Sequence, residues 1–370
     1  EGMSQPASQA QHITMSGGGA YSLATKGAAD VINLAADLVL NAVEAMKLPP
    51  ELPVFQMLDM GCADGGTSLG MIGKVIERVE KTCPDAVFNI IYTDQPRNDF
   101  NALVQMIHGL GPFESYLERF QNVRPLFSAS SFYLPICPPN SVNLGFSATA
   151  MHWLRQKPCD LENHVHMVGA TGDALVKFAE QGKRDWERIL LNRSKELVSG
   201  GRLVLVNFGR DEEGRYLGNT FGVNMFDTFN EIWNEFLENG RISREEYVRM
   251  TLPQYYNTVE EFSAPLTDPA SPVYQSGLRL VDVHTRIVPC PFAEEFKTHG
   301  NVKRFANAYI PTIRSWNQSI FLGALDESRP LEERQELIES YYGTYHQRVL
   351  DAPEGHGMDY VHAYLIVEKI

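Results

Sequence analysis

Two acidic residues stand where apolar runs end, and they are the residues of this chain best suited to hold a polar ligand. The run VFQMLDMG places Asp59 directly before a turn that contains Gly61, Gly65 and Gly66, and the run FNIIYTD ends in Asp94. Glycines in such a turn let the backbone approach a ligand where a Cβ would collide. A strand, a glycine turn and a helix form the first unit of a nucleotide-binding α/β sheet.

The chemistry of this turn differs from that of a phosphate-binding loop. Its glycines lack the spacing of a dinucleotide fingerprint, and no Gly-Lys-Ser/Thr follows to hold a triphosphate. Asp59 therefore favours a positively charged ligand, such as S-adenosylmethionine with its ammonium and sulfonium groups. Asp94 is placed to accept hydrogen bonds from the two hydroxyls of a ribose. The structural alternatives are a helix cap for Asp59 and a solvated strand end for Asp94.

Composition limits the classes of partner. The chain has 370 residues, 44% hydrophobic, and a net charge of −14 without a lysine- or arginine-rich tract, so we expect no nucleic-acid partner. Its five cysteines are scattered without a C-x-x-C pair, which favours reduced thiols and a cytoplasmic location. We expect no membrane span, because no apolar run is long enough, and no signal peptide.

The elements that must position these residues follow from hydrophobic periodicity. A helix is predicted over 28–46, and another over 186–198 before the glycine pair at 200–201. Parallel strands are predicted at 54–59, 88–93, about 124–128, 141–147 and 202–208, and a closing antiparallel pair at 278–288 and 359–370. The expected division is a disordered N-terminus (1–13), a ligand-binding core (14–210), a helical cap (211–324) and a C-terminal part that completes the sheet (325–370).

Several segments, in order along the chain, resemble the SABATH methyltransferases. They are MSGGGAYSLAT, LDMGCADGG, YTDQPRNDFNALV, SSFYLPICPPNSVNLGFSATAMHWL and the long segment from FDTFNEIW to TVEEF. The resemblance implies a Rossmann-like class I methyltransferase fold, with a seven-stranded, mainly parallel sheet and an inserted helical cap. It also implies transfer of a methyl group from S-adenosylmethionine to a carboxylate, and a homodimer.

Site residues are implied by the same resemblance. The cofactor-binding candidates are Tyr21, Asp59, Gly61, Asp94, Gln95, Ser131, Phe132 and Ser147, with Phe132 against the adenine. The pair His152 and Trp153 matches the residues that grip the substrate carboxylate, and they are the catalytic candidates. The expected substrate pocket is completed by Met225, Phe226, Tyr255 and Tyr360. Without the resemblance, each of these aromatic candidates would be interpreted as an ordinary residue of the hydrophobic core.

The reaction needs little acid–base machinery. A carboxylic acid, with a pKa of about 4–5, is already ionised at neutral pH, so no general base is required. We accordingly find no catalytic Ser-His-Asp or Cys-His set. His164 and His166 form a lone His-x-His without neighbouring ligands, so no metal site is expected.

Departures from the family motifs concern the substrate. Ala28 stands where many plant members have a glutamine, and the Ser-Tyr-Ser stretch has become Ser147-Ala148-Thr149. We therefore expect a fatty or other extended carboxylic acid, as in a bacterial fatty-acid or small-acid branch, rather than a small plant aromatic acid. The alternatives are an N-methyltransferase of a xanthine-like heterocycle and a non-catalytic ligand-binding homologue.

Overall fold

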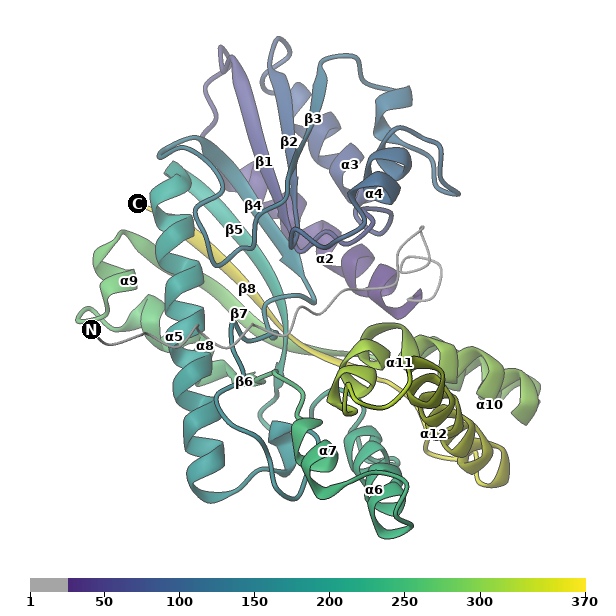
Figure 1. Cartoon of the computed structure of the whole chain (residues 1–370). Coiled ribbons are helices and arrows are strands. Elements are labelled where there is room, and N and C mark those ends of the chain that lie inside the picture. The colour runs from purple at the N-terminus through teal and green to yellow at the C-terminus, as the bar shows by residue number, and fades with distance from the viewer. Residues whose placement is uncertain (1–25) are drawn as a thin grey trace.

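The computed structural model describes residues 26–370, which form one large, mainly parallel sheet with helices around it (Figure 1). The strand order is β3-β2-β1-β4-β5-β8-β7, and the short β6 pairs with β5 off this path. The strands are β1 (Val54–Met60), β2 (Val87–Thr93), β3 (Val123–Ser128), β4 (Val142–Ala148), β5 (Leu197–Arg210), β6 (Asn257–Thr258), β7 (Leu278–Val288) and β8 (Tyr360–Lys369). Strands β1 to β5 are parallel, and β8 runs antiparallel to β5 and β7. The predicted fold class is confirmed. The sheet has one strand more than the seven expected, the two-residue β6.

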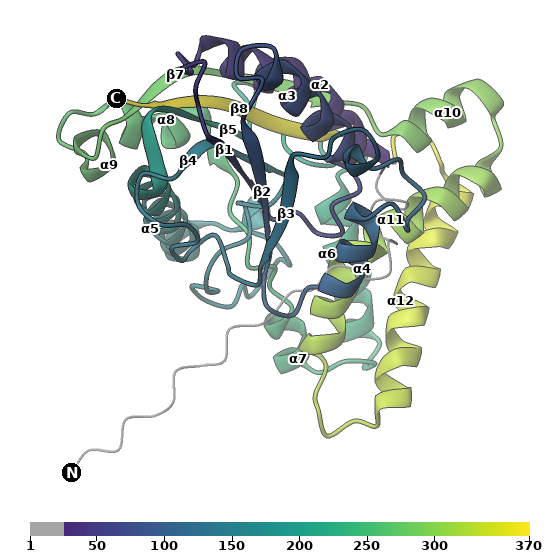
Figure 2. The ribbon, with the colours of Figure 1, turned by 90° about the horizontal axis from the view of Figure 1, so that it is seen from above.

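Helices cover both faces of the sheet, which explains why its central strands are apolar on both sides (Figure 2). On one face, α2 (Lys26–Ala45) and α3 (Leu69–Glu80) pack on Phe55 and Met57 of β1. On the other face, α5 (Gly172–Glu196), α8 (Val259–Thr267) and α9 (Pro272–Gln275) belong to the hydrophobic cluster that includes Leu58 and Met60, and α8 and α9 lie against β7. A short helix, α4 (Phe100–Ile107), follows β2 and is capped by Asp99. The alternation along β1 thus turns Asp59 toward the α2–α3 face.

A helical cap lies beyond the carboxyl ends of the parallel strands (Figure 1). It comprises α6 (Met225–Glu238), α7 (Arg244–Arg249), α10 (Pro291–His299), α11 (Val302–Ala324) and α12 (Leu331–Asp351). Aromatic rings hold it together, with centroids of Trp233 and Tyr341 5.6 Å apart and those of Phe321 and Tyr341 4.4 Å apart. None of the helices in residues 26–370 is both long and apolar enough to cross a membrane.

The division drawn from the sequence differs from these layers at two places. The segment 211–324, expected as cap, also contains β7, which pairs along its length with β8 in the central sheet. The segment 325–370, expected to complete the sheet, begins with α12, which packs against α11 and α6 of the cap. The pairing of 278–288 with 359–370 agrees with the antiparallel pair predicted from the sequence, but a division into contiguous segments cannot assign this strand to the sheet while its neighbours in the chain belong to the cap. The segment 1–13 lies outside the described residues.

Helix α5 starts earlier than the predicted helix at 186–198. It begins at Gly172, because its first half is polar and gives little apolar periodicity, and it ends at Glu196. Strand β5 follows immediately, and the glycine pair 200–201 lies inside it at an irregularity in the pairing with β4. Gly200 has a φ of +78°, a conformation that favours glycine.

A buried ion pair fixes the end of α5 to the loop that carries Ser131 and Phe132. Arg193 donates from Nε and Nη2 to the two carboxylate oxygens of Glu196, at 2.8 and 2.9 Å, and both side chains are buried. Arg193 also donates to the carbonyls of Phe132 and Leu134, at 2.8 Å each. Glu196 accepts the backbone N–H of Ile136 at 2.6 Å. All parts of the pair are therefore satisfied inside the protein, which a buried charge requires.

Replacing Glu196 by Gln should destabilise the protein by about 3–5 kcal/mol, because Arg193 is left as a buried charge without its counter-charge. Urea unfolding followed by fluorescence measures the change. Glu180→Gln is the control: Glu180 faces exposed Arg184 at 3.8 Å, and its loss should cost less than about 1 kcal/mol. Equal, small losses in both variants would show that the buried pair does not anchor this loop.

Candidate functional site

The site lies where the order of the sheet reverses, between β1 and β4. These strands pair in parallel, with Asp59 opposite Phe146 and Met60 opposite Ser147. The chain leaves β1 toward β2 on one side, and β4 leads to β5 on the other, so their outgoing loops diverge and leave a crevice. Ser147 is fully buried and donates its hydroxyl to the Met60 carbonyl at 2.9 Å, which ties the two strands at this edge.

The glycine turn after β1 approaches the turn after β4 closely. Gly61 has a φ of +70°, and a Cβ on it would lie 2.4 Å from the Cβ of Ala150. The same point is 3.8 Å from the ring of Phe132. Ala63 also has a positive φ, 51°, which is unusual for a residue with a side chain. The turn after β1 is thus held against the segment that leads to His152 and Trp153.

Asp59 is a carboxylate with little contact with water. It is 3% exposed and accepts a hydrogen bond from the Ser68 hydroxyl at 2.7 Å. Burial raises the pKa of Asp59 to about 7; the Ser68 hydrogen bond lowers it and the nearby carboxylate of Asp94 raises it. A positively charged group beside Asp59 would favour its ionised form. The pocket at this point is also lined by Ile32, Cys62, Thr67, Ala148 and Thr149.

Asp94 is half-buried at the end of β2 and holds the glycine turn. One carboxylate oxygen accepts the N–H of Ala63 at 2.8 Å, and the other accepts the N–H of Gln95 at 2.7 Å. Burial raises its pKa, and these hydrogen bonds lower it. Each carboxylate oxygen has a further lone pair, so Asp94 is able to accept two hydroxyl donors in addition.

The other cofactor-side candidates lie around the same crevice, with one outside the described residues. Ser131 is half-buried, and its hydroxyl accepts the Tyr133 N–H at 3.3 Å. Phe132 is half-buried beside Gly61 and Tyr133, whereas the Ser147 hydroxyl already bonds to Met60. Tyr21 lies outside residues 26–370.

His152 and Trp153 are held between two backbone segments. Leu154 donates its N–H to the Pro253 carbonyl at 2.8 Å, and Tyr255 donates to the His152 carbonyl at 3.0 Å. The Tyr133 hydroxyl donates to the Trp153 carbonyl at 2.5 Å. The backbone of this pair is therefore fixed by contacts both to the core and to the segment that leads into α8.

The side chains of the pair carry two buried nitrogens without a hydrogen-bond partner among the described residues: His152 Nδ1 and Trp153 Nε1. The two rings are 5.3 Å apart between centroids. An unsatisfied buried donor costs about 1–3 kcal/mol, so such groups require an explanation. Burial lowers the pKa of His152 to about 3, with nearby His362 contributing, so this imidazole is neutral and a weak base at neutral pH. The Trp153 indole is a neutral N–H donor, and the His152 imidazole is a second one in the tautomer that carries its proton on Nδ1.

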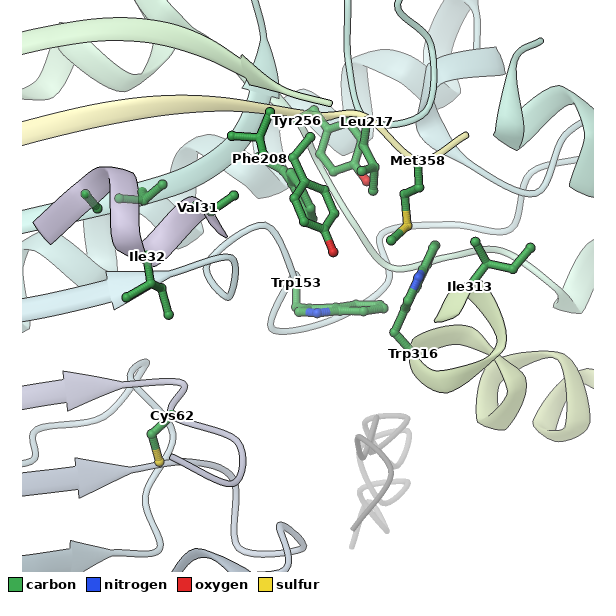
Figure 3. Close-up of a cluster of buried hydrophobic side chains, with 14 of the residues drawn as sticks. Val31, Ile32, Cys62, Trp153, Phe208, Leu217, Tyr256, Ile313, Trp316 and Met358 are labelled. Atoms are coloured by element: carbon green, nitrogen blue, oxygen red, sulfur yellow. The ribbon is translucent and has the colours of Figure 1, made fainter. Parts of the chain in front are cut away.

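An aromatic and methionine-rich cluster surrounds Trp153 (Figure 3). The picture shows Ile32 and Cys62 on one side of the Trp153 ring and Trp316, Ile313 and Met358 on the other. Phe226 and Met225, at the start of α6, belong to the same core, as does Tyr360, whose ring centroid is 5.4 Å from that of Phe208.

Tyr255 is turned away from this cluster. Its hydroxyl donates to Glu261 at 2.8 Å and accepts from Arg210 at 3.1 Å, and its ring packs on Gly182 of α5. The neighbouring Tyr256 takes the expected place, with ring centroids 5.9 Å from both His152 and Phe208. Tyr255 was the tyrosine expected near the substrate, but in this structure Tyr256 is the one whose ring lies beside His152. The segment 252–256 is irregular, so no periodicity fixes which tyrosine faces this cluster.

Sequence reasoning also missed residues that come from distant elements. They include Ser68, Thr149, Phe208, Tyr256, Trp316, Met358 and His362. Thr149 has a φ of 58°, and its hydroxyl lies 3.0 Å from Nε2 of His362 on β8. A threonine in this backbone region is strained, which is typical of functional sites, but strain cannot be seen in a sequence. Among residues 26–370, no three His, Cys, Asp or Glu side chains are grouped to hold a metal ion.

Comparisons with known proteins point to one family. The sequence profile of the SAM-dependent carboxyl methyltransferases matches residues 9–271, more than half of the chain. Gibberellic acid methyltransferase 2 of Arabidopsis thaliana is 24% identical over 253 residues, covering 63% of this chain and 64% of the relative. A benzoic acid/salicylic acid carboxyl methyltransferase of Petunia hybrida is 28% identical over 213 residues, covering 53% and 58%. The chain thus spans less than two thirds of the length of these relatives.

One solved structure has the same fold along nearly the whole chain. A loganic acid methyltransferase with SAH superposes with a TM-score of 0.71 at 22% identity, covering 96% of this chain and 98% of that one. Asp59 lines the crevice between β1 and β4, and Asp94, at the end of the adjacent strand β2, holds the glycine turn beside it.

Asp59→Asn should stabilise the protein without ligand at pH 8 while weakening cofactor binding. An unfolded aspartate ionises near its model value of 3.8, and folded Asp59 ionises near 7, so ionising it costs folding free energy. That cost grows between about pH 4 and pH 7 and is complete above pH 7, so the gain in Tm should be largest at pH 8 and vanish near pH 4.

S-adenosylmethionine affinity should fall about 30-fold or more in Asp59→Asn, as for the loss of one partner of a buried charge pair. Wild-type affinity should itself weaken below about pH 7, and the variant should lose this dependence. Thermal scans and calorimetry across pH measure both effects. Unchanged affinity in the variant would remove Asp59 from the cofactor site.

Proposed function

Because the chain belongs to the family of SAM-dependent carboxyl methyltransferases, we propose that it transfers a methyl group from S-adenosylmethionine to the carboxylate of a small-molecule acid. The observation that carries this proposal is the pair of unpartnered, buried nitrogens on His152 and Trp153. A carboxylate has two oxygens that accept hydrogen bonds, so it satisfies two adjacent donors at once.

The pair would bind and orient the acid rather than move its proton. A carboxylic acid is ionised at neutral pH, so its oxygen is already nucleophilic and needs no general base. The low pKa of His152, about 3, agrees with a role as a hydrogen-bond donor in its neutral form. Holding the carboxylate in one orientation would accelerate methyl transfer, because it keeps the attacking oxygen close to and aligned with the methyl group. The surrounding apolar side chains exclude water, which would otherwise compete for the carboxylate.

On the other side of Gly61, Asp59 would balance the positive charge of the cofactor, and Asp94 would accept the ribose hydroxyls. Ser131, Phe132 and Gln95 would border the adenosine. When bound, S-adenosylmethionine supplies the methyl group in electrophilic form. The protein supplies the two holding surfaces and keeps them adjacent through the contact of Gly61 with Ala150.

For the acid, we propose an extended, apolar body such as a fatty chain. The side chains that support it are apolar or aromatic and come from the cap as well as the core: Phe208, Met225, Phe226, Trp316, Met358 and Tyr360. Methionines adapt to different shapes, so this lining suits a long acid. Relatives are named for gibberellic, benzoic, salicylic and indole-3-acetic acids, all of which are carboxylic acids.

A panel of acids and xanthines, incubated with methyl-labelled S-adenosylmethionine, tests the function. Fatty and aromatic acids should give methyl esters, and xanthines should give no product. Methylation of xanthines alone would favour the N-methyltransferase alternative. Absence of cofactor binding in calorimetry would favour a non-catalytic homologue.

We make two further proposals, one on the cellular compartment of the protein and one on its oligomeric state. Its five cysteines are all free thiols, which supports a reducing compartment such as the cytoplasm. Strand β3 is an edge of the sheet with Leu126 exposed, which is compatible with a homodimer. Light scattering in solution measures the oligomeric state.

Trp153→Phe should lower kcat/KM for the acid by about 5- to 100-fold, because it removes an N–H donor from a dry site at a cost of about 1–3 kcal/mol. Most of the ring packing is kept, and S-adenosylmethionine affinity should scarcely change. Kinetics, calorimetry and a thermal scan on one preparation separate these effects.

Trp186→Phe is the matched control. The Trp186 indole donates to the Phe262 carbonyl at 3.0 Å on the opposite face of the sheet. This variant should lose Tm and keep its activity per molecule. If Trp153→Phe behaves in the same way, Trp153 only packs.

A further inference from the structure

The His-x-His pair at 164 and 166 has no part in the function derived so far, yet both rings are hydrogen-bonded within the protein. His164 Nδ1 lies 3.0 Å from both the backbone N–H and the backbone carbonyl of His166. Its Nε2 lies 3.1 Å from Oδ1 of Asp227. Among residues 26–370, no group of three potential ligands forms around this pair to hold a metal ion.

The tautomer and orientation of His166 are fixed by its two ring hydrogen bonds. Its Nδ1 accepts the Val168 N–H at 3.2 Å, so its proton lies on Nε2. Nε2 donates to Oε1 of Gln254 at 3.0 Å. Its ring is fully buried and stacks on Phe226, with centroids 4.0 Å apart. His166 thus presents one N–H, in one direction, to Gln254.

Gln254 receives two donors on one oxygen. Besides His166, the Tyr256 hydroxyl donates to Oε1 at 2.9 Å, and Gln254 is only 1% exposed. A buried amide that accepts two hydrogen bonds on its oxygen cannot rotate by 180° without opposing donors to its NH₂ group. The two donors therefore select one orientation of the Gln254 side chain.

This hydrogen-bond network contacts His152 and Trp153, the two residues proposed to bind the substrate carboxylate, through both the backbone and the aromatic rings. Gln254 forms a backbone bridge with Trp153, next to the hydrogen bond between Leu154 and Pro253. The Tyr256 ring packs near His152, with centroids 5.9 Å apart, and near His166 at 4.8 Å. A shift of Gln254 or Tyr256 would therefore change the positions of both His152 and Trp153.

We propose that His166, Gln254 and Tyr256 form a positioning relay that sets the alignment of the His152 and Trp153 donors toward the substrate carboxylate. This inference rests on the proposed carboxyl methylation. The relay residues do not act on the acid directly. They hold the segment 252–256 in the one arrangement in which the two unpartnered nitrogens are presented together. Loss of a relay hydrogen bond should affect acid turnover and leave cofactor binding intact.

A double-mutant cycle on Tyr256→Phe and Gln254→Met tests the relay. Each single variant should lower kcat/KM for the acid by about five- to tenfold, with S-adenosylmethionine affinity within about twofold of wild type. The double variant should be no worse than Gln254→Met alone, because both changes break the same unit. Wild-type kcat/KM in Tyr256→Phe, or additive losses in the double variant, would overturn the relay.

Tyr341→Phe is the matched control. Tyr341 is also fully buried, and its hydroxyl also donates over 2.9 Å, to the Phe229 carbonyl within the cap. It should lose stability similar to that lost by Tyr256→Phe and keep the kinetic constants of wild type. Equal kinetic losses in both tyrosine variants would mean that general loosening explains the effect.

A second readout does not depend on turnover. The indole ¹H–¹⁵N signal of Trp153, one of four tryptophans, is assigned by its loss in Trp153→Phe. It should shift in Tyr256→Phe and Gln254→Met and stay in place in Tyr341→Phe. If wild type binds the cofactor but methylates no acid, the proposed function fails, while this signal still decides the relay. An unmoved signal in both relay variants would overturn the relay even if the methylation proposal holds.

Discussion

The close contact between Gly61 and Ala150 is the constraint on which the candidate site depends. It joins the turn after β1, which carries the acidic groups, to the turn after β4, which leads to the neutral donors. A side chain at position 61 would have to push these turns apart, because its Cβ would lie 2.4 Å from that of Ala150. Parallel pairing of β1 with β4 brings the strand ends to one edge, but two small residues determine how closely their loops approach.

The two halves of the crevice have opposite electrostatic character. On the β1–β2 side, Asp59 and Asp94 are carboxylates, and the burial of Asp59 makes its charge depend on a cationic neighbour. On the β4 side, His152 and Trp153 are uncharged donors that favour an anion. In the proposed function, a cationic methyl donor and an anionic acceptor would each meet their own complement. The proposal therefore depends on both halves of the crevice and not on either one alone.

Much of this arrangement was predictable from the sequence because it depends on local patterns. Apolar runs that end in Asp59 and Asp94 gave the strands, and Gly61 marked the turn. The His-Trp dipeptide was visible only through motif resemblance. Tyr256 was missed in favour of Tyr255, since adjacent residues in an irregular segment point in different directions and no period decides between them.

Contacts between residues far apart in the sequence could not be predicted, for a different physical reason. The partners of His166, Gln254 and Phe208 come from elements separated by dozens of residues, and only tertiary packing brings them together. The layer of a helix is equally hard to predict: the sequence predicted the antiparallel pair of β7 with β8, whereas α12, whose apolar periodicity is weak, packs in the cap and not beside the sheet. Sequence patterns report which face of an element is buried but not what buries it.

The place of β8 has a consequence for how the protein is made. This strand follows every other described element in the chain, yet it lies inside the sheet between β5 and β7 and carries His362 and Tyr360 to the site. During synthesis, β5 and β7 therefore leave the ribosome before the strand that joins them, with unpaired backbone groups along the edges that β8 later covers. The sheet and the candidate site are completed only after β8 has been synthesised.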